Sequence, residues 1–443
     1  MKIPEKVQWI IETLEQAGYE AYAVGGCVRD TLLGREPGDW DITTSANPME
    51  IKALFSRTVD TGIKHGTVTV MLGKEGFEVT TYRIDGSYSD GRHPDQVFFT
   101  SQLWEDLRRR DFTINAMAYN PKTGIVDLFG GQADLQARVI HCVGEAKERF
   151  SEDALRMLRA VRFSAQLDFG IEEETGKAIV ELAGNLEKIS KERIRTEMVK
   201  LLVSPHPDRI RTAWELGITA VILPEFDVMM KQEQHTKYHR YGVGEHTIQV
   251  MLHTPPEKVL RLAALFHDMG KPAAHTTNEE GIDSFKGHAA ISAKMARERM
   301  VDWKFDNDTI DQVVLLVQYH DVRIEPVKNH VRRLLSKIGI EAFPLLMTLQ
   351  RADAEGKAEA FLQGSLERIA QMEQLAEEIL VDQECFSLKQ LAVDGKVLKE
   401  AGMKPGKAMG ELLHQMLDYV MEHPECNDKE QLLTLFAGAI NQG

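Results

Sequence analysis

Residues 24–42 read VGGCVRDTLLGREPGDWDI and contain the features that decide the fold of the first part of the chain. The residues just before this stretch are apolar, and two glycines, Gly25 and Gly26, separate them from a helix-like segment that starts near Val28. Exposed backbone amides in such a turn can bind a phosphate group. A Gly-Gly turn after a strand is more often structural than functional, so this prediction depends on the neighbouring residues.

The second feature of the stretch is the Asp-x-Asp pair of Asp39 and Asp41. In a strand, side chains at positions i and i+2 leave the same face, so we expect these two carboxylates to converge. Adjacent carboxylates repel each other unless a cation lies between them, and Mg²⁺ prefers such oxygens together with substrate phosphate. Glu78, on a later strand-like run, is a candidate third carboxylate, although it also suits a solvent-facing position. Because the pair lies near the glycine turn and Arg29 in the sequence, we interpret it as part of a phosphoryl-transfer site and not as two charged surface residues.

Short apolar runs alternate with glycine-rich turns through the first 135 residues, which predicts a mixed α/β domain. From about Gln136 onward helical spacing takes over, and we expect the strands to stop there. The predicted fold class is therefore α+β, with a mixed α/β head followed by a helical remainder. The predicted domains are the head at 1–135, a helical neck and body at 136–235, a third domain at 236–355 and a helical tail at 356–443.

The composition limits the classes of function. Asp and Glu outnumber Lys and Arg by 68 to 53, and the net charge of −15 excludes a uniformly basic nucleic-acid-coating protein, although not a local basic site. No apolar run approaches the ~20 residues that span a bilayer, and the N-terminus lacks an apolar signal core, so we expect a cytoplasmic protein without membrane contact. The scattered cysteines form no CxxC pair, and we expect them to be reduced. They are Cys27, Cys142, Cys385 and Cys426.

Five segments of the chain, in this order and spacing, resemble the class II branch of the tRNA nucleotidyltransferase and bacterial poly(A) polymerase superfamily. The resemblance covers roughly residues 20–165. The segments are GGCVRDTLLGREPGDWDITTSA at 25–46, TYRIDGSYSDGRHPDQVFF at 81–99, RRRDFTINAMAY at 108–119, DLFGG at 127–131 and EDALRMLRAVRF at 152–163.

The resemblance implies a nucleotidyltransferase head that acts on the 3′ end of tRNA with CTP and ATP. In the family, the Asp-x-Asp pair that Asp39 and Asp41 match binds two metal ions, here expected to be Mg²⁺, for an in-line displacement. The glycine turn and its arginine cradle the triphosphate, and the segment at 110–115 selects the ribose. The nucleotide-binding residues that the resemblance implies in the head are Gly25, Gly26, Arg29, Arg110, Asp111 and Asn115.

The segment that begins at Ser151 has the pattern of a helix start, with Ser151 as the N-cap and two acids in the first turn. Asp153, Arg156, Arg159 and Arg162 follow at i+3 steps and form one stripe. In the family, the Asp and the first Arg serve as a protein template for the base. Asp153 and Arg156 would then reject G and U, since those bases leave a buried acceptor unpaired. The two later arginines would hold phosphate or stack.

Members of the superfamily differ in what they add: CCA, CC only, A only, or poly(A). The loop at 83–100 is full length here and carries Asp90 and Arg92 as an acidic and basic pair, which disfavours CC-only addition. Poly(A) polymerases of this branch usually carry basic extensions, and the acidic chain fits them poorly. Full CCA addition is our first choice, and A-only addition stays open. The oligomeric state is also left open.

A second group of candidate metal ligands lies in the helical part, each on its own helical stretch. Its order, His, His-Asp, His, His, Asp, resembles the HD phosphohydrolase superfamily over about residues 245–355. Mixed imidazole and carboxylate ligands suit Mn²⁺, Ni²⁺, Co²⁺ or Fe²⁺, and metal-bound hydroxide would attack a cyclic phosphate or phosphomonoester. A single histidine on an apolar helix face is more often a core residue, and the region could be a helical tRNA-binding body without metals. The residues are His246, His267, Asp268, His288, His320 and Asp353.

Three hypotheses follow from the sequence. The first is an enzyme that adds nucleotides to tRNA, with an accessory HD phosphohydrolase activity. The second is an RNA-binding or nucleotide-sensing protein whose polymerase site is vestigial, and the intact Asp39, Asp41, Asp111, Asp153 and Arg156 argue against it. The third is an HD signalling phosphodiesterase with a borrowed nucleotide domain.

Overall fold

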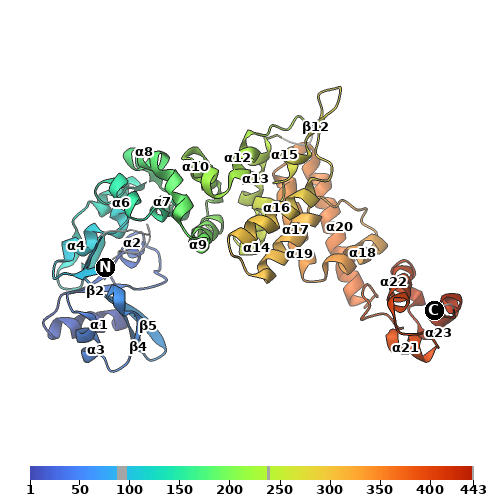
Figure 1. Ribbon diagram of the computed structural model, residues 1–443, viewed down its shortest axis with the longest axis horizontal. Helices are drawn as coiled ribbons and strands as arrows, with labels where there is room; N and C mark the ends of the chain where they lie inside the picture. Colours follow the sequence, from blue (N-terminus) through green and yellow to red (C-terminus); the bar gives the residue numbers. More distant parts are fainter. Residues whose placement is uncertain (87–96, 237–239, 442–443) are drawn as a thin grey trace. The chain divides into compact units, whose positions relative to one another are not determined.

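The computed structural model describes residues 1–86, 97–236 and 240–441, and the predicted loop pair Asp90 and Arg92 lies outside them. The chain forms two compact units, Met1–Asp227 and Val228–Gly443 (Figure 1). Among the described residues, no helix combines the length and the apolar character that a membrane crossing requires.

The head is built on a seven-stranded sheet, as far as its described residues go, in the order β3-β4-β5-β2-β1-β8-β9. Strand β1 is antiparallel to β2 and to β8, while β2 is parallel to β5, with Ile42 opposite Val79. This register brings the residues just before β2 next to Glu78 of β5. The strands are β1 (Ala21–Val24), β2 (Ile42–Thr44), β3 (Thr58–Gly62), β4 (Thr67–Leu72), β5 (Glu75–Thr81), β8 (Met117–Asn120) and β9 (Gly124–Asp127), with β6 (Arg83–Asp85) and β7 (Val97–Phe99) as a separate pair.

Helices cover the sheet of the head because each presents an apolar stripe. Helix α1 (Glu5–Gln16) buries Val7, Ile10, Ile11 and Leu14, which recur at helical spacing and face the sheet. Figure 1 shows α3 (Pro48–Leu54) beside β4 and β5. The other helices of this unit are α2 (Gly26–Leu32), α4 (Leu103–Arg108), α5 (Gly131–Ala137), α6 (Ala146–Glu152), α7 (Leu155–Leu167), α8 (Glu173–Leu182), α9 (Lys191–Leu202), α10 (Ile210–Glu215) and α11 (Ile218–Ile222), and α12 (Pro224–Lys231) spans the boundary of the two units.

The prediction that Ser151 starts a helix is wrong. Helix α6 ends at Glu152 and α7 begins at Leu155, so Ser151 lies in the last turn of α6, where its hydroxyl donates to the Lys147 carbonyl at 2.7 Å. Asp153 is extended between the two helices, and its carboxylate accepts from the Leu155 amide at 3.1 Å. Ala154 is the N-cap of α7 and makes no side-chain cap hydrogen bond, so the predicted cap is wrong and Asp153 lies in the break between the helices.

The expected end of all strands near Gln136 is also too strict. Two short strand pairs occur in the helical part, because each closes a connection between helices. Strand β10 (Val139–Ile140) is parallel to β11 (Gly170–Ile171), and β12 (Thr276–Thr277) is antiparallel to β13 (Asp283–Ser284). The helical character of the remainder is otherwise confirmed.

The second unit packs its helices around buried apolar side chains such as Phe266 and Trp303, whose rings lie 6.4 Å apart. Of the predicted domain boundaries, the one at 235/236 lies eight residues after the division of the compact units at 227/228. The boundaries at 135/136 and 355/356 stay predictions. The helices are α13 (Val243–His253), α14 (Lys258–Phe266), α15 (Lys271–Ala274), α16 (His288–Asp302), α17 (Asn307–Tyr319), α18 (Lys328–Ile338), α19 (Ala342–Glu355), α20 (Leu362–Val381), α21 (Gly395–Glu400), α22 (Lys407–Glu422), α23 (Lys429–Leu435) and α24 (Ala437–Ile440).

Candidate functional sites in the head and in the helical unit

The three predicted carboxylates of the head, Asp39, Asp41 and Glu78, line one cleft of about 610 Å³. Asp39 and Asp41 precede β2 instead of lying in it, so the strand geometry predicted for the pair is wrong. They still share the cleft, because the parallel register of β2 and β5 sets Asp41 beside Glu78.

The carboxylates of this cleft repel one another. Removal from solvent raises the pKa of Asp41. The positive charge of Arg110 lowers this pKa, and the negative charge of Asp39 raises it. Removal from solvent followed by the charges of Asp41 and Asp39 raises the pKa of Glu78. Much of each residue still faces water, which screens these charges. A group of oxygen acceptors that repel each other in an open cleft fits a divalent cation such as Mg²⁺.

The glycine turn lies against Arg110. Gly25 has a φ of 83°, and a Cβ atom there would lie 2.9 Å from Nη1 of Arg110, so only glycine fits. Arg110 itself is held by Asp106, a fully buried carboxylate 3.5 Å from Nη2 that also pairs with Arg109 at 2.8 Å. The sequence reasoning missed Asp106. Its i,i+3 and i,i+4 spacing to Arg109 and Arg110, which follow the end of α4, is the signal that could have found it.

Arg29, Asn115 and Asp111 form a hydrogen-bonded chain next to this turn. Arg29 Nη1 donates to Asn115 Oδ1 at 2.6 Å, and Asn115 Nδ2 donates to Asp111 Oδ1 at 3.1 Å. Arg159 Nε donates to the other Asp111 oxygen at 2.8 Å. Burial alone raises the pKa of Asp111, but Arg159 and Asn115 reverse this and hold it below its usual range. Four of the predicted nucleotide-binding residues are thus brought together.

Phe163 is the centre around which three of these arginines gather. The guanidinium carbons lie 5.0 Å from the ring centroid for Arg29, 5.4 Å for Arg159 and 3.9 Å for Arg162. Glu197, from α9, lies 2.6 Å from Arg162 Nε. The ring and this acid hold like charges close together, and neither was predicted from the sequence. Glu197 was missed because α9 is distant along the chain from α7.

Asp153 and Arg156, the predicted base-reading pair, are each held by a separate partner. The Asp153 carboxylate accepts from Arg193 of α9 at 2.6 and 3.2 Å. Arg156 is buried, donates to Glu152 at 2.6 Å and donates to the Arg109 carbonyl at 2.9 Å. The structure therefore fixes both side chains at the junction of α6 and α7 without pairing them with each other. Arg193 was missed for the same reason as Glu197.

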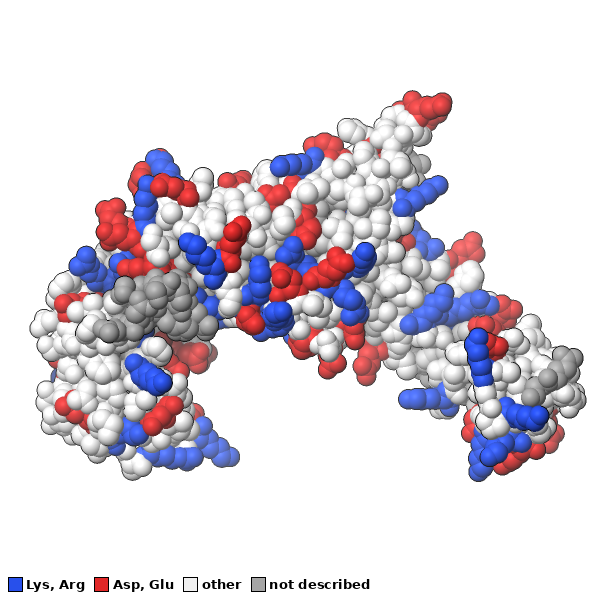
Figure 2. Space-filling model, in the orientation of Figure 1, with Lys and Arg blue, Asp and Glu red and all other residues white. Residues whose placement is uncertain are grey.

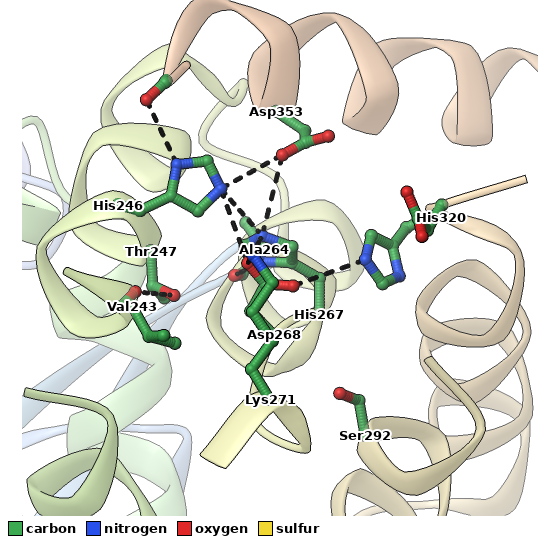
Figure 3. A network of polar contacts seen from close by, with 12 residues as sticks. Val243, His246, Thr247, Ala264, His267, Asp268, Lys271, Ser292, His320 and Asp353 are labelled. Atoms are coloured by element: carbon green, nitrogen blue, oxygen red, sulfur yellow. Dashed lines mark hydrogen bonds and ion pairs between the residues drawn. The ribbon is translucent and has the colours of Figure 1, made fainter. Parts of the chain in front are cut away.

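The histidine and aspartate residues of the helical unit converge from separate helices, as predicted. Figure 3 shows the side chains of His246, His267, Asp268, His320 and Asp353 directed toward one another. The Nε2 atom of His246 lies 3.1 Å from Asp353 and 3.5 Å from Asp268. Among the described residues, the groups of three or more metal-type ligand atoms within 4.8 Å of one another belong to this cluster. They are His246, His267 and Asp268, and Asp268, His288 and His320.

The hydrogen bonds of the imidazoles orient their rings. Nδ1 of each histidine lies within hydrogen-bond distance of a backbone carbonyl, which only accepts, so Nδ1 carries a proton and Nε2 is directed toward the other members of the cluster. These distances are 3.1 Å for His246, 2.7 Å for His267, 2.8 Å for His288 and 2.7 Å for His320. Metal-binding histidines are oriented in this way.

The cluster is rich in acceptors and poor in donors, which fits a bound cation. Nε2 of His288 and Nε2 of His320 lie 3.2 Å apart, and those of His246 and His267 lie 3.4 Å apart, so at most one Nε2 of each pair carries a proton. Asp268 Oδ2 is buried without a hydrogen-bond partner, although Lys271 Nζ is 2.7 Å away as an ion pair. A divalent metal ion at this point would satisfy these groups.

The lysines beside the cluster were not predicted. Lys271 and Lys357 follow Asp268 at i+3 and Asp353 at i+4, and each forms an ion pair with that carboxylate. Burial alone raises the pKa of Asp268, but His267 and Lys271 reverse this and keep the carboxylate ionised. The helical spacing of each pair is the signal that could have found them.

Basic and acidic side chains are interspersed on the surface of both units, on the face that Figure 2 draws. This pattern agrees with the expectation that a nucleic-acid site, if present, is local. The cysteines are free, as predicted from their scattered positions.

Three family models match the chain. Residues 21–141 match the poly A polymerase head domain, residues 168–230 match the probable RNA and SrmB-binding site of polymerase A, and residues 274–436 match tRNA nucleotidyltransferase domain 2, putative. The third match includes His288, His320 and Asp353, so the predicted assignment of this region to the HD superfamily stays a prediction.

Similar proteins cover almost the whole chain. The CCA-adding enzyme of Lactobacillus helveticus is 36% identical over 428 residues, which are 95% of this chain and 94% of that protein. The CCA-adding enzyme of Limosilactobacillus reuteri is 38% identical over 434 residues, 97% of this chain and 95% of that protein. The crystal structure of the Bacillus stearothermophilus CCA-adding enzyme in complex with CTP has a TM-score of 0.71 at 30% identity and covers 100% of this chain and 98% of that one. On this full-length similarity and the shared fold, the chain belongs to the CCA-adding enzyme family.

Proposed function

We propose that this chain adds C and A nucleotides from CTP and ATP to the 3′ end of tRNA. The observation that carries the proposal is the open cleft of Asp39, Asp41 and Glu78 next to Arg110, in a member of the CCA-adding enzyme family. A substrate of this kind is found in the cytoplasm, which is the location we expect.

In this proposal the three carboxylates hold Mg²⁺, which supplies Lewis-acid polarisation of the phosphoryl group when bound. Arg29 and Arg110 bind the oxygens of the triphosphate beside the glycine turn. Their guanidinium groups are already oriented by Asn115 and by Asp106, so little side-chain entropy is lost on binding.

The sugar and base contacts follow from the same network. Asp111 and Asn115 bind the ribose hydroxyls, and because both Asp111 oxygens already accept hydrogen bonds, ribose must share or replace the donor Arg159. Asp153 accepts from the exocyclic amine of cytosine or adenine, and Arg156 donates to the ring edge. G and U offer no amine to Asp153 at that edge of the base, so they bind more weakly.

One gel tests the proposal. Synthetic tRNAs that end before CCA, after the first C and after CC are incubated with CTP, ATP or both, and the products are sized. Addition of two C and one A to the first substrate supports CCA addition. Growth only on the third substrate indicates A-only addition, long tails indicate poly(A) synthesis, and no growth on any substrate contradicts the proposal in favour of an RNA-binding protein with a vestigial site.

A second candidate function belongs to the helical unit. The buried cluster of imidazoles and carboxylates, with Nε2 atoms directed inward, supports a metal-dependent phosphohydrolase of the HD type. Mn²⁺, Ni²⁺, Co²⁺ or Fe²⁺ would activate water for attack on a phosphate ester when bound. The test is metal analysis of the purified protein, then hydrolysis of 2′,3′-cyclic AMP and bis-p-nitrophenyl phosphate after each metal is supplied. No bound metal and no turnover would leave a helical body whose HD pattern is a relic.

A further inference from the structure

A cavity of about 330 Å³ opens beside the histidine cluster. His320 and Asp353, two of the predicted ligands, form part of its wall, and the first turns of α20 form another part. A second cavity of about 310 Å³ reaches Asp268 and His288 and shares His320 and Asp353 with the first. A substrate at the cluster therefore has room on two sides, and the size of each cavity suits a small organic molecule.

Two arginines, Arg323 and Arg368, line the first cavity together. Among the described residues, Arg368 donates to two neutral acceptors, Gln350 Oε1 at 3.4 Å and Met372 Sδ at 3.6 Å. Arg323 Nη2 forms a long ion pair with Asp321 Oδ1 at 3.6 Å, which is beyond hydrogen-bond distance. Both guanidinium groups thus retain donors for a ligand, in contrast to Lys271 and Lys357, which form close ion pairs with Asp268 and Asp353.

Gln350 holds the two sides of this cavity in place. It is 5% exposed, lies on α19 and donates through Nε2 to the Val322 carbonyl at 3.0 Å. Its Oε1 atom accepts from Arg368. The amide therefore joins the segment that carries Arg323 to the helix that carries Arg368, and it does so without adding a negative charge.

The local charge favours an anion. Burial lowers the pKa of Arg368 and the positive charge of Arg323 lowers it further, while the carboxylate of Asp353 raises it. Arg323, Lys357 and Arg368 outnumber Asp353 among the charged residues that line the cavity, and the two guanidinium groups repel each other. A dianionic phosphate relieves this repulsion and accepts hydrogen bonds from both guanidinium groups. The paired N–H donors of arginine match the oxygens of a phosphate group.

We infer that Arg323 and Arg368 form a phosphate subsite beside the histidine cluster, which binds the anionic group of a small phosphate ester whose organic part occupies the 330 Å³ cavity. Turnover of that ester rests on the proposed hydrolase function, whereas its binding does not. Arg323 and Arg368 are specificity residues in this scheme, because they select esters with a free phosphate.

The binding test uses phenyl phosphate, a probe without a base or sugar, and calorimetry on the full-length metal-free protein at about 50 mM salt. CTP is present so that the head site is filled. The variants Arg368→Gln and Arg323→Gln with Arg368→Gln remove charge at similar volume. Arg297→Gln, an exposed arginine paired with Asp311 at 2.7 Å, is the matched control. We expect the Kd to rise about tenfold for each arginine removed, since each loses a charge-assisted hydrogen bond, and to stay unchanged in the control.

An unchanged Kd in the folded double variant would overturn the inference. A variant that weakens tRNA binding but not phenyl phosphate binding would also overturn it, because the arginines would then serve RNA. The turnover test compares KM and kcat for p-nitrophenyl phosphate with metal supplied. A raised KM at nearly constant kcat supports the subsite.

The two proposals fail in different ways. If the wild type binds phenyl phosphate through these arginines but hydrolyses no ester with any metal, the hydrolase function fails and the subsite stands. If it hydrolyses esters and the double variant changes neither Kd nor KM, the subsite fails and the hydrolase function stands. Circular dichroism and the Tm of each variant confirm that it is folded.

Discussion

The two candidate metal sites of this chain differ in how much of the coordination the protein supplies. In the head, Asp39, Asp41 and Glu78 line an open cleft and largely face water. In the helical unit, His246, His267 and Asp268 are 0%, 0% and 1% exposed, and their ligand atoms lie within 4.8 Å of one another. A site with a few open carboxylates requires phosphates of the substrate to complete it, whereas a buried cluster is complete before a substrate arrives.

The arginine and lysine side chains near the two sites also differ, in whether their donors are already used by partners within the protein. In the head, Arg29, Arg159 and Arg162 contact Asn115, Asp111 and Glu197, so a nucleotide must share or replace these partners. In the helical unit, the lysines neutralise ligand carboxylates while Arg323 and Arg368 keep free donors. The first arrangement suits selective binding of a large ligand, and the second suits a small anion.

The largest effect that the comparison predicts on nucleotide addition is that of Asp41→Ala. This change removes a carboxylate that acts on the transition state and should lower kcat for CTP incorporation by ~100-fold or more, while the Kd for tRNA stays nearly constant. Single-turnover incorporation and filter binding measure the two quantities. Asp60→Ala, at an exposed acid of the head paired with Lys52 at 2.9 Å, is the control. Incorporation near the wild-type rate in Asp41→Ala would contradict the Mg²⁺ assignment.

Much of this comparison could be made from the sequence. Alternating apolar runs and glycine turns predicted strands at β1, β4 and β5, and a helix does follow β1, although α2 begins at Gly26, two residues before the predicted start near Val28. The strand predictions rest on local periodicity, which backbone geometry translates directly into a face. The grouping of the histidines and aspartates was implied by an order of residues that resembles the HD superfamily, and the structure brings these residues together.

The second prediction concerns base selection at the junction of α6 and α7. Asp153→Ala removes the proposed acceptor for the exocyclic amine, so discrimination of CTP from UTP should fall by ~1 to 3 kcal/mol. The ratio of kcat/KM for the two nucleotides measures it. Arg193→Ala is informative because Arg193 binds the same carboxylate at 2.6 Å and should weaken discrimination less than the loss of Asp153 itself. If UTP is excluded from Asp153→Ala as strictly as from the wild type, the template assignment is wrong.

What the sequence could not predict depends on contacts between distant segments. Arg193 and Asp153 are 40 residues apart, and no local pattern links them. The break between α6 and α7 was missed because an acid near a helix start favours both a cap and a first turn. Asp39 and Asp41 were assigned to a strand that begins only at Ile42, since strand ends depend on pairing with a neighbour and not on propensity alone.

A smaller effect is expected from salt. Although the chain is acidic, tRNA binding must neutralise phosphates with local arginines and lysines and release counterions. If two phosphates are neutralised, the affinity should fall about tenfold between ~50 and ~200 mM salt. Filter binding at several salt concentrations gives the slope, and it should be the same for wild type and for the His267→Ala, Asp268→Ala double variant. A flat slope would contradict tRNA as the substrate, and a slope that changes in the double variant would place tRNA contacts near the cluster.

The smallest effect on nucleotide addition is expected from that double variant, in which bound transition metal should fall to the level of the buffer. The cluster and the carboxylate cleft share no ligand and lie in separate compact units, so CTP and ATP incorporation should stay within about twofold of the wild type. Metal content by mass spectrometry and the addition gel measure the two outcomes on one preparation.

The double variant has a structural risk, because Lys271 is 4% exposed and loses the Asp268 carboxylate, while its contact with Gln234 at 2.8 Å remains. Removal of one partner of a buried ion pair costs ~3 to 5 kcal/mol. Asp268→Asn keeps the volume and a polar partner for Lys271, and it should lose metal with a smaller decrease in Tm. If this folded variant also loses nucleotide addition, the two sites are energetically coupled, and the contrast between an open head site and a self-contained helical site does not hold. If Asp268→Asn loses metal but retains nucleotide addition, the two sites are independent, because removal of the Asp268 charge then affects the helical unit alone.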